Sequence, residues 1–394
     1  MGAIGAAGSV FRLLENICIG LKSPSPHDGT VVHKGQIAIQ SDGLCCALAA
    51  SKNRGYTAPV RAAWKRLRYR VEWLAVKAAG SPVPLLSRKA CYRMGQLVGN
   101  LAAKFDKRNF RVTLSNLEAA FGDTFSVAQR EEIGRESYRQ FARTVFDLFW
   151  LPAVSSDNFW RYAEFEGLDR LRADIGPTNQ CIFAVFHYGN FEWLSPATAW
   201  SGLLTDVVTQ QFKNPLLDNI FRRLREHAGH SSVPRNRAII RLYRTLRKNG
   251  RAGLLVDTTL APHHPTVVID CFGLKTIVTV AHAWLYEKTG APLIPIYSES
   301  LPDGRWRIVT LPKVQVPAGA THQEIAQLCW DAFEPVVRRN PAPWLWMYKH
   351  WRYKPIAAER AYPFYAQESP FFEQIASRAN YAKLDRAAAL EAMQ

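Results

Sequence analysis

The 394-residue sequence contains no run of 18 consecutive apolar residues, so no segment of it predicts a plain transmembrane helix. Its seven cysteines show no CxxC spacing, which argues against a zinc site or a disulfide framework and favours a reducing compartment. GxSxG, Walker A and GxGxxG patterns are missing, so serine hydrolases and the common nucleotide-binding folds have no support. The paired histidines His227/His230 and His263/His264 lack the carboxylate of an HExxH motif, and we expect neither a metal nor a cofactor.

The composition excludes a disordered chain and predicts an anionic partner. Hydrophobic residues make up 48% of the chain and charged residues 21%, enough to form a sizeable core. Lys and Arg total 50 against 33 Asp and Glu, a net charge of +17, which favours acidic lipids, a phosphorylated substrate or nucleic acid. No nucleic-acid motif is present and the basic residues are spread along the chain, so we expect no nucleic-acid partner. The 12 tryptophans are typical of a protein that sits at a membrane interface.

Changes in composition divide the chain into four parts. Residues 1–56 are rich in Gly, Ala and Ser and read as a variable N-terminal extension. Residues 57–150 form a basic helical region that we expect to associate with a membrane, and residues 151–355 alternate short apolar runs with helical stretches. Residues 356–394 hold polar and Ala-rich helix formers, which predict a peripheral C-terminal tail.

The first helix of the basic region carries an apolar stripe. The stripe recurs at steps of three and four residues, at Trp64, Leu67, Val71, Leu74 and Ala78. Cations surround it, at Arg61, Lys65, Arg66, Arg68 and Lys77. The pattern fits a helix that lies in a membrane surface, and equally a helix that packs on the domain. Three more helices are predicted at 88–106, 109–121 and 126–150, the last with a capping box formed by Ser126 and Gln129.

The central part of the chain predicts an α/β domain. Its apolar runs lie at 181–186, 205–210, 252–257 and 292–297, with helical stretches between them. Such alternation indicates repeated βα units around a mixed, mainly parallel central sheet flanked by helices.

The most informative stretch is CIFAVFHYGNFEWL, residues 181–194. A buried strand ends there at His187, and Asn190 is a good N-cap for a helix that begins at Phe191. His187 would therefore lie at the carboxyl end of a strand, where open α/β sheets bind their ligands. Glu192 would lie in the first helical turn, and a bend could bring its carboxylate back to the imidazole as the partner of a general base. A structural histidine at a strand end fits the same spacing.

The residues His187-Tyr-Gly-Asn-Phe-Glu192 resemble the HxxxxE signature of the lysophospholipid acyltransferase superfamily. The wider form FAVFHYGNFEW is similar to the bacterial lipid A biosynthesis (lauroyl and myristoyl) acyltransferase family. Further landmarks follow the family's order over about residues 60–355: SNLEAAFGD at 115–123, KNPLLDNIFRRLRE at 213–226, AGLLVD ending at Asp257, CFG at 271–273, EKTGAPLIPI at 287–296 and NPAPWLWMYKHWR at 340–352.

The resemblance implies roles for particular residues. His187 would be the general base, with Glu192 and Asp257 as catalytic carboxylates. A strand-end Asp257 beside a strand-end His187 would complete a relay, which we favour over the alternative that this carboxylate caps the next helix. Arg225 falls where the family has a functional Arg, and we expect it to bind a phosphate of the substrate through its bidentate geometry. Arg235 and Arg237 could hold the same phosphate, and Asn190 is a further substrate-binding candidate. A cluster such as Arg222/Arg223/Arg225 is otherwise usually a solvated helix face.

The resemblance further implies an O-acyltransferase at the cytoplasmic face of the inner membrane. It would move a fatty acyl group from an acyl carrier protein or coenzyme A thioester to a hydroxyl of a lipid A precursor or related glycolipid, on an anionic membrane surface. The family's Tyr-Arg-Pro element is replaced here by Thr209-Gln210-Gln211. Other acceptors therefore stay open (a phosphoinositol mannoside, an aminolipid or a lysophospholipid), as does a catalytically silent, membrane-binding relative.

Overall fold

The computed structural model describes residues 58–236, 238–261 and 264–377. Its N-terminal part is helical, with α2 (Ala58–Gly80), η1 (Val83–Leu85), α3 (Arg88–Phe105), α4 (Lys107–Phe121), η2 (Gly122–Thr124) and α5 (Val127–Trp150). Ser87 and Asp106 cap α3 and α4, and Ser126 and Gln129 form the expected capping box at the start of α5. The predicted helices are confirmed, with boundaries that differ by one or two residues from the expected ones.

A seven-stranded sheet forms the centre of the molecule, in the order β1-β9-β8-β2-β5-β3-β4. Its strands are β1 (Ala163–Glu166), β2 (Cys181–Val185), β3 (Asp206–Thr209), β4 (Ser231–Pro234), β5 (Arg251–Leu255), β8 (Leu293–Ser300) and β9 (Trp306–Thr310). All neighbours pair in parallel except β8 and β9, which are antiparallel. The predicted mixed, mainly parallel sheet is confirmed.

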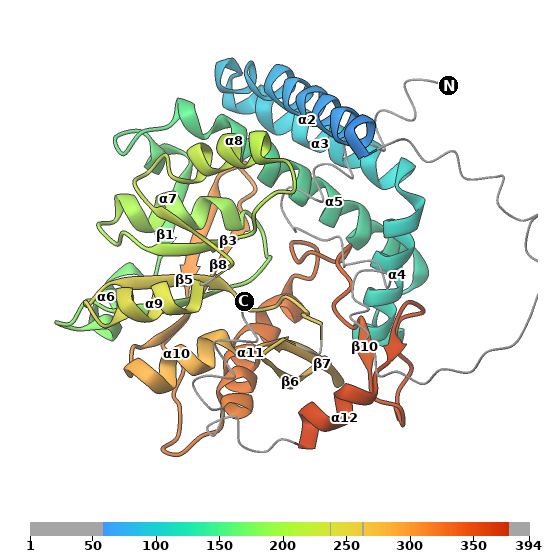
Figure 1. Cartoon of the computed structure of the whole chain (residues 1–394), viewed down its shortest axis with the longest axis vertical. Coiled ribbons are helices and arrows are strands. Elements are labelled where there is room, and N and C mark those ends of the chain that lie inside the picture. Colours follow the sequence, from blue (N-terminus) through green and yellow to red (C-terminus); the bar gives the residue numbers. More distant parts are fainter. Residues whose placement is uncertain (1–57, 237, 262–263, 378–394) are drawn as a thin grey trace, which may run out of the picture.

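Helices flank this sheet, and a hairpin and short elements complete the fold. The helices are α6 (Leu168–Ile175), α7 (Leu194–Trp200), α8 (Pro215–Arg225), α9 (Ala238–Leu246), α10 (Ala281–Thr289), α11 (His322–Arg339) and α12 (Pro370–Ser377). The remaining elements are η3 (Leu151–Ala153), η4 (Phe159–Arg161), η5 (Phe191–Trp193), the antiparallel hairpin β6 (Thr266–Cys271) and β7 (Leu274–Thr279), and the pair β10 (Tyr353–Lys354) and β11 (Gln367–Glu368). Figure 1 shows α2, α3 and α8 at one end of the molecule and α11, β6 and β7 toward the other.

Strand β2 lies between two apolar cores. Ile182 and Ala184 belong to one cluster of buried side chains, whereas Cys181 and Phe183 belong to another on the opposite face. A central parallel strand is covered on both faces, which explains why this segment reads as a continuous apolar run. The strand thus holds His187, two residues beyond its end, in a fixed place.

The tryptophans lie mainly in the interior rather than at the surface. Trp344, Trp346 and Trp351 are almost fully buried beside Trp330, and Trp193 and Trp306 are buried in the second core. The high Trp content therefore serves packing, a difference from the expectation that it marks an interface. Trp64 on α2 is an exception, because 60% of its surface is exposed.

The first part of the expected peripheral C-terminal tail, residues 356–377, is partly packed against the core. Phe372 and Ile375 of α12 are buried in the main core, so residues 356–377 belong in part to the packed structure. The expected N-terminal extension and residues 378–394 lie outside the described residues. Among the helices of the described ranges, none is both long enough and apolar enough to cross a bilayer.

Candidate active site

His187 and Asp257 meet at the carboxyl ends of neighbouring strands. Val185 of β2 is in register with Leu255 of β5, and each strand is followed, two residues on, by one of the pair. The imidazole Nδ1 lies 2.8 Å from Asp257 Oδ1. Both side chains are nearly buried, with 7% and 1% of their surfaces exposed. The expected proximity of the two side chains is therefore present.

The Asp257 carboxylate is fixed by further bonds. Its Oδ2 accepts a hydrogen bond from the backbone N–H of His187 at 2.9 Å and another from Trp344 Nε1 at 3.0 Å. Burial acts to raise the pKa of Asp257, but the electrostatic interaction and hydrogen bond with His187, together with the bond from Trp344, outweigh burial and hold this pKa below its ordinary value. An ionised carboxylate favours the tautomer with the proton on Nδ1, which leaves Nε2 as the basic nitrogen.

Glu192 is paired with Arg225 rather than with the imidazole. Arg225 Nε donates to Glu192 Oε2 at 3.0 Å and Nη2 donates to Oε1 at 2.6 Å, a bidentate pair with little exposure. The turn of η5 directs Glu192 to the end of α8, so the carboxylate that contacts His187 is Asp257. Arg225, expected at a phosphate, is used in this structure to hold Glu192.

The side chain of Asn190 is engaged within the protein. Its Oδ1 accepts from Trp193 N at 3.2 Å, which makes it the predicted N-cap of η5, and its Nδ2 donates to Asp147 Oδ2 at 2.9 Å. Gly189 beside it has φ +59°, and a Cβ there would lie 2.0 Å from the carbonyl oxygen of Ser298. Only glycine fits this turn, and Asn190 holds the turn in shape rather than facing a ligand.

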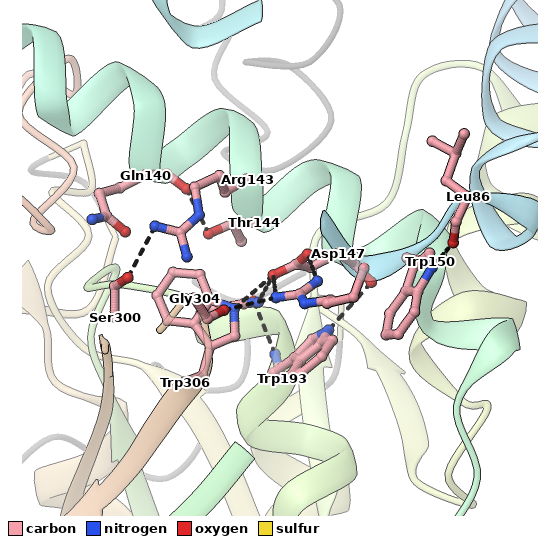
Figure 2. Close-up of polar contacts among 12 residues, drawn as sticks. Leu86, Gln140, Arg143, Thr144, Asp147, Trp150, Trp193, Ser300, Gly304 and Trp306 are labelled. Carbon is pink, nitrogen blue, oxygen red and sulfur yellow. Dashed lines mark hydrogen bonds and ion pairs between the residues drawn. The ribbon is translucent and has the colours of Figure 1, made fainter. Parts of the chain in front are cut away.

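A buried network behind the turn was missed by the sequence analysis (Figure 2). Asp147 of α5 accepts two bonds from the Arg88 guanidinium, a bond from Trp306 Nε1 at 2.6 Å and the bond from Asn190. Its backbone carbonyl accepts from Trp193 Nε1 at 3.2 Å. The only signal in the sequence was a carboxylate within an apolar helix pattern. The network joins α3 and α5 to the turn that carries the motif.

Arg143, one helical turn before Asp147, is also buried. Its guanidinium lies between the rings of Tyr92 and Trp306 and donates to Ser300 Oγ at 2.9 Å. Burial lowers the pKa of Arg143 relative to its ordinary value, although Asp147 opposes this shift. Figure 2 shows Arg143 and Asp147 directed from the same helix toward the sheet.

The remaining predicted residues lie outside this arrangement. Arg235 follows β4 in an exposed turn, and its Nη1 lies 3.5 Å from Gln210 Oε1. Arg237 lies outside the described residues, as does His263. His227 contacts the carbonyl of Val154 at 2.9 Å. Within the part of the chain that the structure describes, no three His, Cys, Asp or Glu side chains gather as metal ligands.

Comparisons with known proteins agree with one another. The family model described as bacterial lipid A biosynthesis acyltransferase matches residues 60–353. The lipid A biosynthesis lauroyltransferase of Escherichia coli (strain K12) is 21% identical over 308 residues, which cover 75% of this chain and 95% of that protein. The matched residues include the whole sheet and the His187–Asp257 pair.

Proposed function

Because this chain belongs to the bacterial lipid A biosynthesis acyltransferase family and is an acyltransferase, we propose that it acylates a hydroxyl group of a lipid A precursor or a related glycolipid. The observation that carries this proposal is the buried His187–Asp257 pair at the carboxyl edge of the sheet. A general base held by an ionised carboxylate suits the removal of a proton from an alcohol.

In the proposed reaction, His187 Nε2 accepts the proton of the acceptor hydroxyl as its oxygen attacks the thioester carbonyl carbon. The new C–O bond forms, the C–S bond breaks, and the departing thiolate takes the proton from the imidazolium. Asp257 remains ionised and compensates the imidazolium charge, as its buried, triply hydrogen-bonded carboxylate allows. The products are an ester and a free thiol, without a covalent enzyme intermediate.

Glu192 and Arg225 take a different part in this proposal. Their bidentate pair fixes the end of α8 against η5, directly after the turn that carries His187. The planar guanidinium of Arg225 suits a phosphate as well as the Glu192 carboxylate. We propose that Arg225 recognises an acceptor phosphate while Glu192 holds the Arg225 guanidinium in position.

The acyl donor is proposed to be a thioester of acyl carrier protein or coenzyme A, used at the cytoplasmic face of the inner membrane. The net charge of +17 supports either donor, because both carry negative charge. The acceptor is less constrained, since Gln210 replaces the arginine of the family pattern and contacts Arg235 instead. An aminolipid, a lysophospholipid or a phosphoinositol mannoside is the second candidate.

Mass spectrometry of total lipids, including lipid A, tests the proposal. Cells expressing the wild type should contain a species heavier by one acyl group, and cells expressing His187→Ala should lack it. His227→Ala is the matched control, because the side chain of this histidine interacts with the Val154 carbonyl and the Trp200 ring, and its loss should leave the product unchanged. The comparison is then repeated with lipid extracts of the native source. If the wild type and His187→Ala give identical lipid profiles there although both proteins are well expressed, the proposal would be contradicted and a catalytically silent relative favoured.

A further inference from the structure

We propose that the outward faces of α2 and α3 form one apolar platform that seats the protein on an anionic bilayer. On α2 the predicted stripe is exposed, with Trp64, Leu67, Val71 and Leu74 between 50% and 60% exposed. The exposed residues of the platform are Trp64, Leu67, Val71 and Leu74 of α2, Leu85 of η1, and Met94, Leu97, Leu101 and Phe105 of α3. A soluble monomer rarely exposes so many large apolar side chains together.

The inner faces of the two helices fix the direction of this platform. Val76 of α2 and Ala102 and Ala103 of α3 are buried in the same apolar cluster, together with Tyr138 of α5. The exposed stripes lie on the other sides of the helices, so both face away from this shared core. Figure 1 shows α2 and α3 along the same end of the molecule.

Helix α3 cannot rotate to bury its exposed stripe. Gly95 and Gly99 face α5 so closely that a Cβ would lie 2.9 Å from Arg143 Cγ and 2.5 Å from Arg139 Cα, respectively. Arg88 at the start of α3 is held by the buried Asp147. The helix is therefore fixed, and its apolar face needs a partner outside the described fold.

Charge identifies a bilayer as that partner. Residues 62–111 contain Glu72 and Asp106 as their only acidic side chains. The basic side chains of the same segment are Lys65, Arg66, Arg68, Arg70, Lys77, Arg88, Lys89, Arg93, Lys104, Lys107, Arg108 and Arg111. Apolar stripes bordered by cations fit helices that lie in the headgroup region of acidic lipids. Since neither helix is apolar enough to cross the bilayer, both would lie in its plane.

The platform is joined to the active site through α8. Asn214, the N-cap of α8, donates to the Tyr69 carbonyl at 2.9 Å and to Glu72 Oε2 at 3.0 Å on α2. At the other end of α8, Arg225 holds Glu192. The link between the platform and catalysis rests on the proposed function, in which a lipid acceptor would reach the active site from the membrane surface on which the platform lies.

Vesicle flotation of the full chain tests the platform directly. The variant Leu67→Ser/Leu97→Ser/Leu101→Ser should bind vesicles of phosphatidylethanolamine and phosphatidylglycerol at least tenfold more weakly than the wild type. Val127→Ser/Ile356→Ser is the matched control, because both side chains are exposed and apolar but lie outside the platform. It should bind like the wild type, and vesicles of phosphatidylcholine alone should bind the wild type more weakly.

Acyl transfer measured in parallel separates this inference from the proposed function. The platform variant should lose transfer to an acceptor in vesicles and keep transfer to the same acceptor in detergent micelles, which also shows that it is folded. Wild type that binds vesicles but transfers no acyl group would contradict the function and leave the platform standing. Unchanged flotation of the platform variant would overturn the inference, and point to residues 1–57 or a second copy as the cover.

Discussion

Replacing Asp257 by Asn tests the proposed base most sharply. Oδ2 of Asp257 accepts from two N–H donors, of His187 and Trp344, so the amide oxygen of Asn must take that place. The amide nitrogen then occupies the position of Oδ1, 2.8 Å from His187 Nδ1. A donor at that position forces Nδ1 to accept, and the ring proton moves to Nε2. The nitrogen that should remove the acceptor proton is thereby blocked.

The expected loss of activity is large. The same exchange in a Ser-His-Asp triad lowers kcat by about 10⁴-fold, which corresponds to roughly 5.5 kcal/mol in the activation free energy. We expect a decrease of about 10³- to 10⁴-fold in kcat for Asp257→Asn, with a small change in KM. The fold should persist, because both bonds to Oδ2 are retained.

The assay is release of free thiol from the acyl donor, with the melting temperature measured for each variant. Trp344→Phe is the control, because it removes one bond to Oδ2 and leaves the Nδ1 contact with Oδ1 in place. It should lose about tenfold, in line with one charge-assisted hydrogen bond. If Asp257→Asn kept more than about a tenth of the wild-type kcat, the tautomer argument would fail and a different carboxylate would have to support His187.

Three further outcomes follow from the site and its surroundings. Arg225→Lys should lower kcat/KM about tenfold, because lysine cannot make the bidentate contact with Glu192. In a double-mutant cycle with Glu192→Gln, the losses in kcat/KM should be less than additive, and additive losses would contradict a shared role of the two residues. Gly189→Ala should lower the melting temperature more than Gly176→Ala, since both residues have positive φ but only the first Cβ would meet a neighbouring atom; equal losses would show that φ alone matters. Burial lowers the pKa of His350 to about 4 in the folded protein. As the pH falls below about 6.5, the unfolded chain therefore binds a proton at His350 that the folded protein does not bind, which stabilises the unfolded state. Between pH 7.5 and 5.5 this should cost about 1.4 kcal/mol of unfolding free energy, measured by denaturant titration, and an equally steep decline in His350→Asn would refute the assignment.

Much of the helical and sheet framework could be predicted from the sequence. The capping box of Ser126 and Gln129 and the amphipathic spacing located α5, because both signals are local. The meeting of His187 and Asp257 was also foreseeable, since both follow apolar runs that become parallel strands. Sheet edges thus allow a non-local contact to be inferred from local patterns.

Other contacts of the site depend on packing that no spacing reveals. The partner of Glu192 is set by where α8 ends against η5, which follows from the tertiary fold. Asp147 was missed for a similar reason, because its donors come from α3, the motif turn and β9, far apart in the sequence. Whether the Trp64 stripe faces solvent or core was likewise undecidable from periodicity, since either placement satisfies the same pattern.

The alignment of β2 with β5 has a consequence for how this protein can diverge. His187 and Asp257 are 70 positions apart in the sequence, and the loops between them can lengthen at little cost, since doubling a loop adds only about 0.6 kcal/mol of closure entropy. One residue inserted or deleted within either strand would instead turn the following side chain to the opposite face of the sheet. Relatives should therefore differ freely in the lengths of their loops. The histidine should always lie two positions after the last residue of β2, and the aspartate two positions after the last residue of β5, as they do here after Val185 and Leu255.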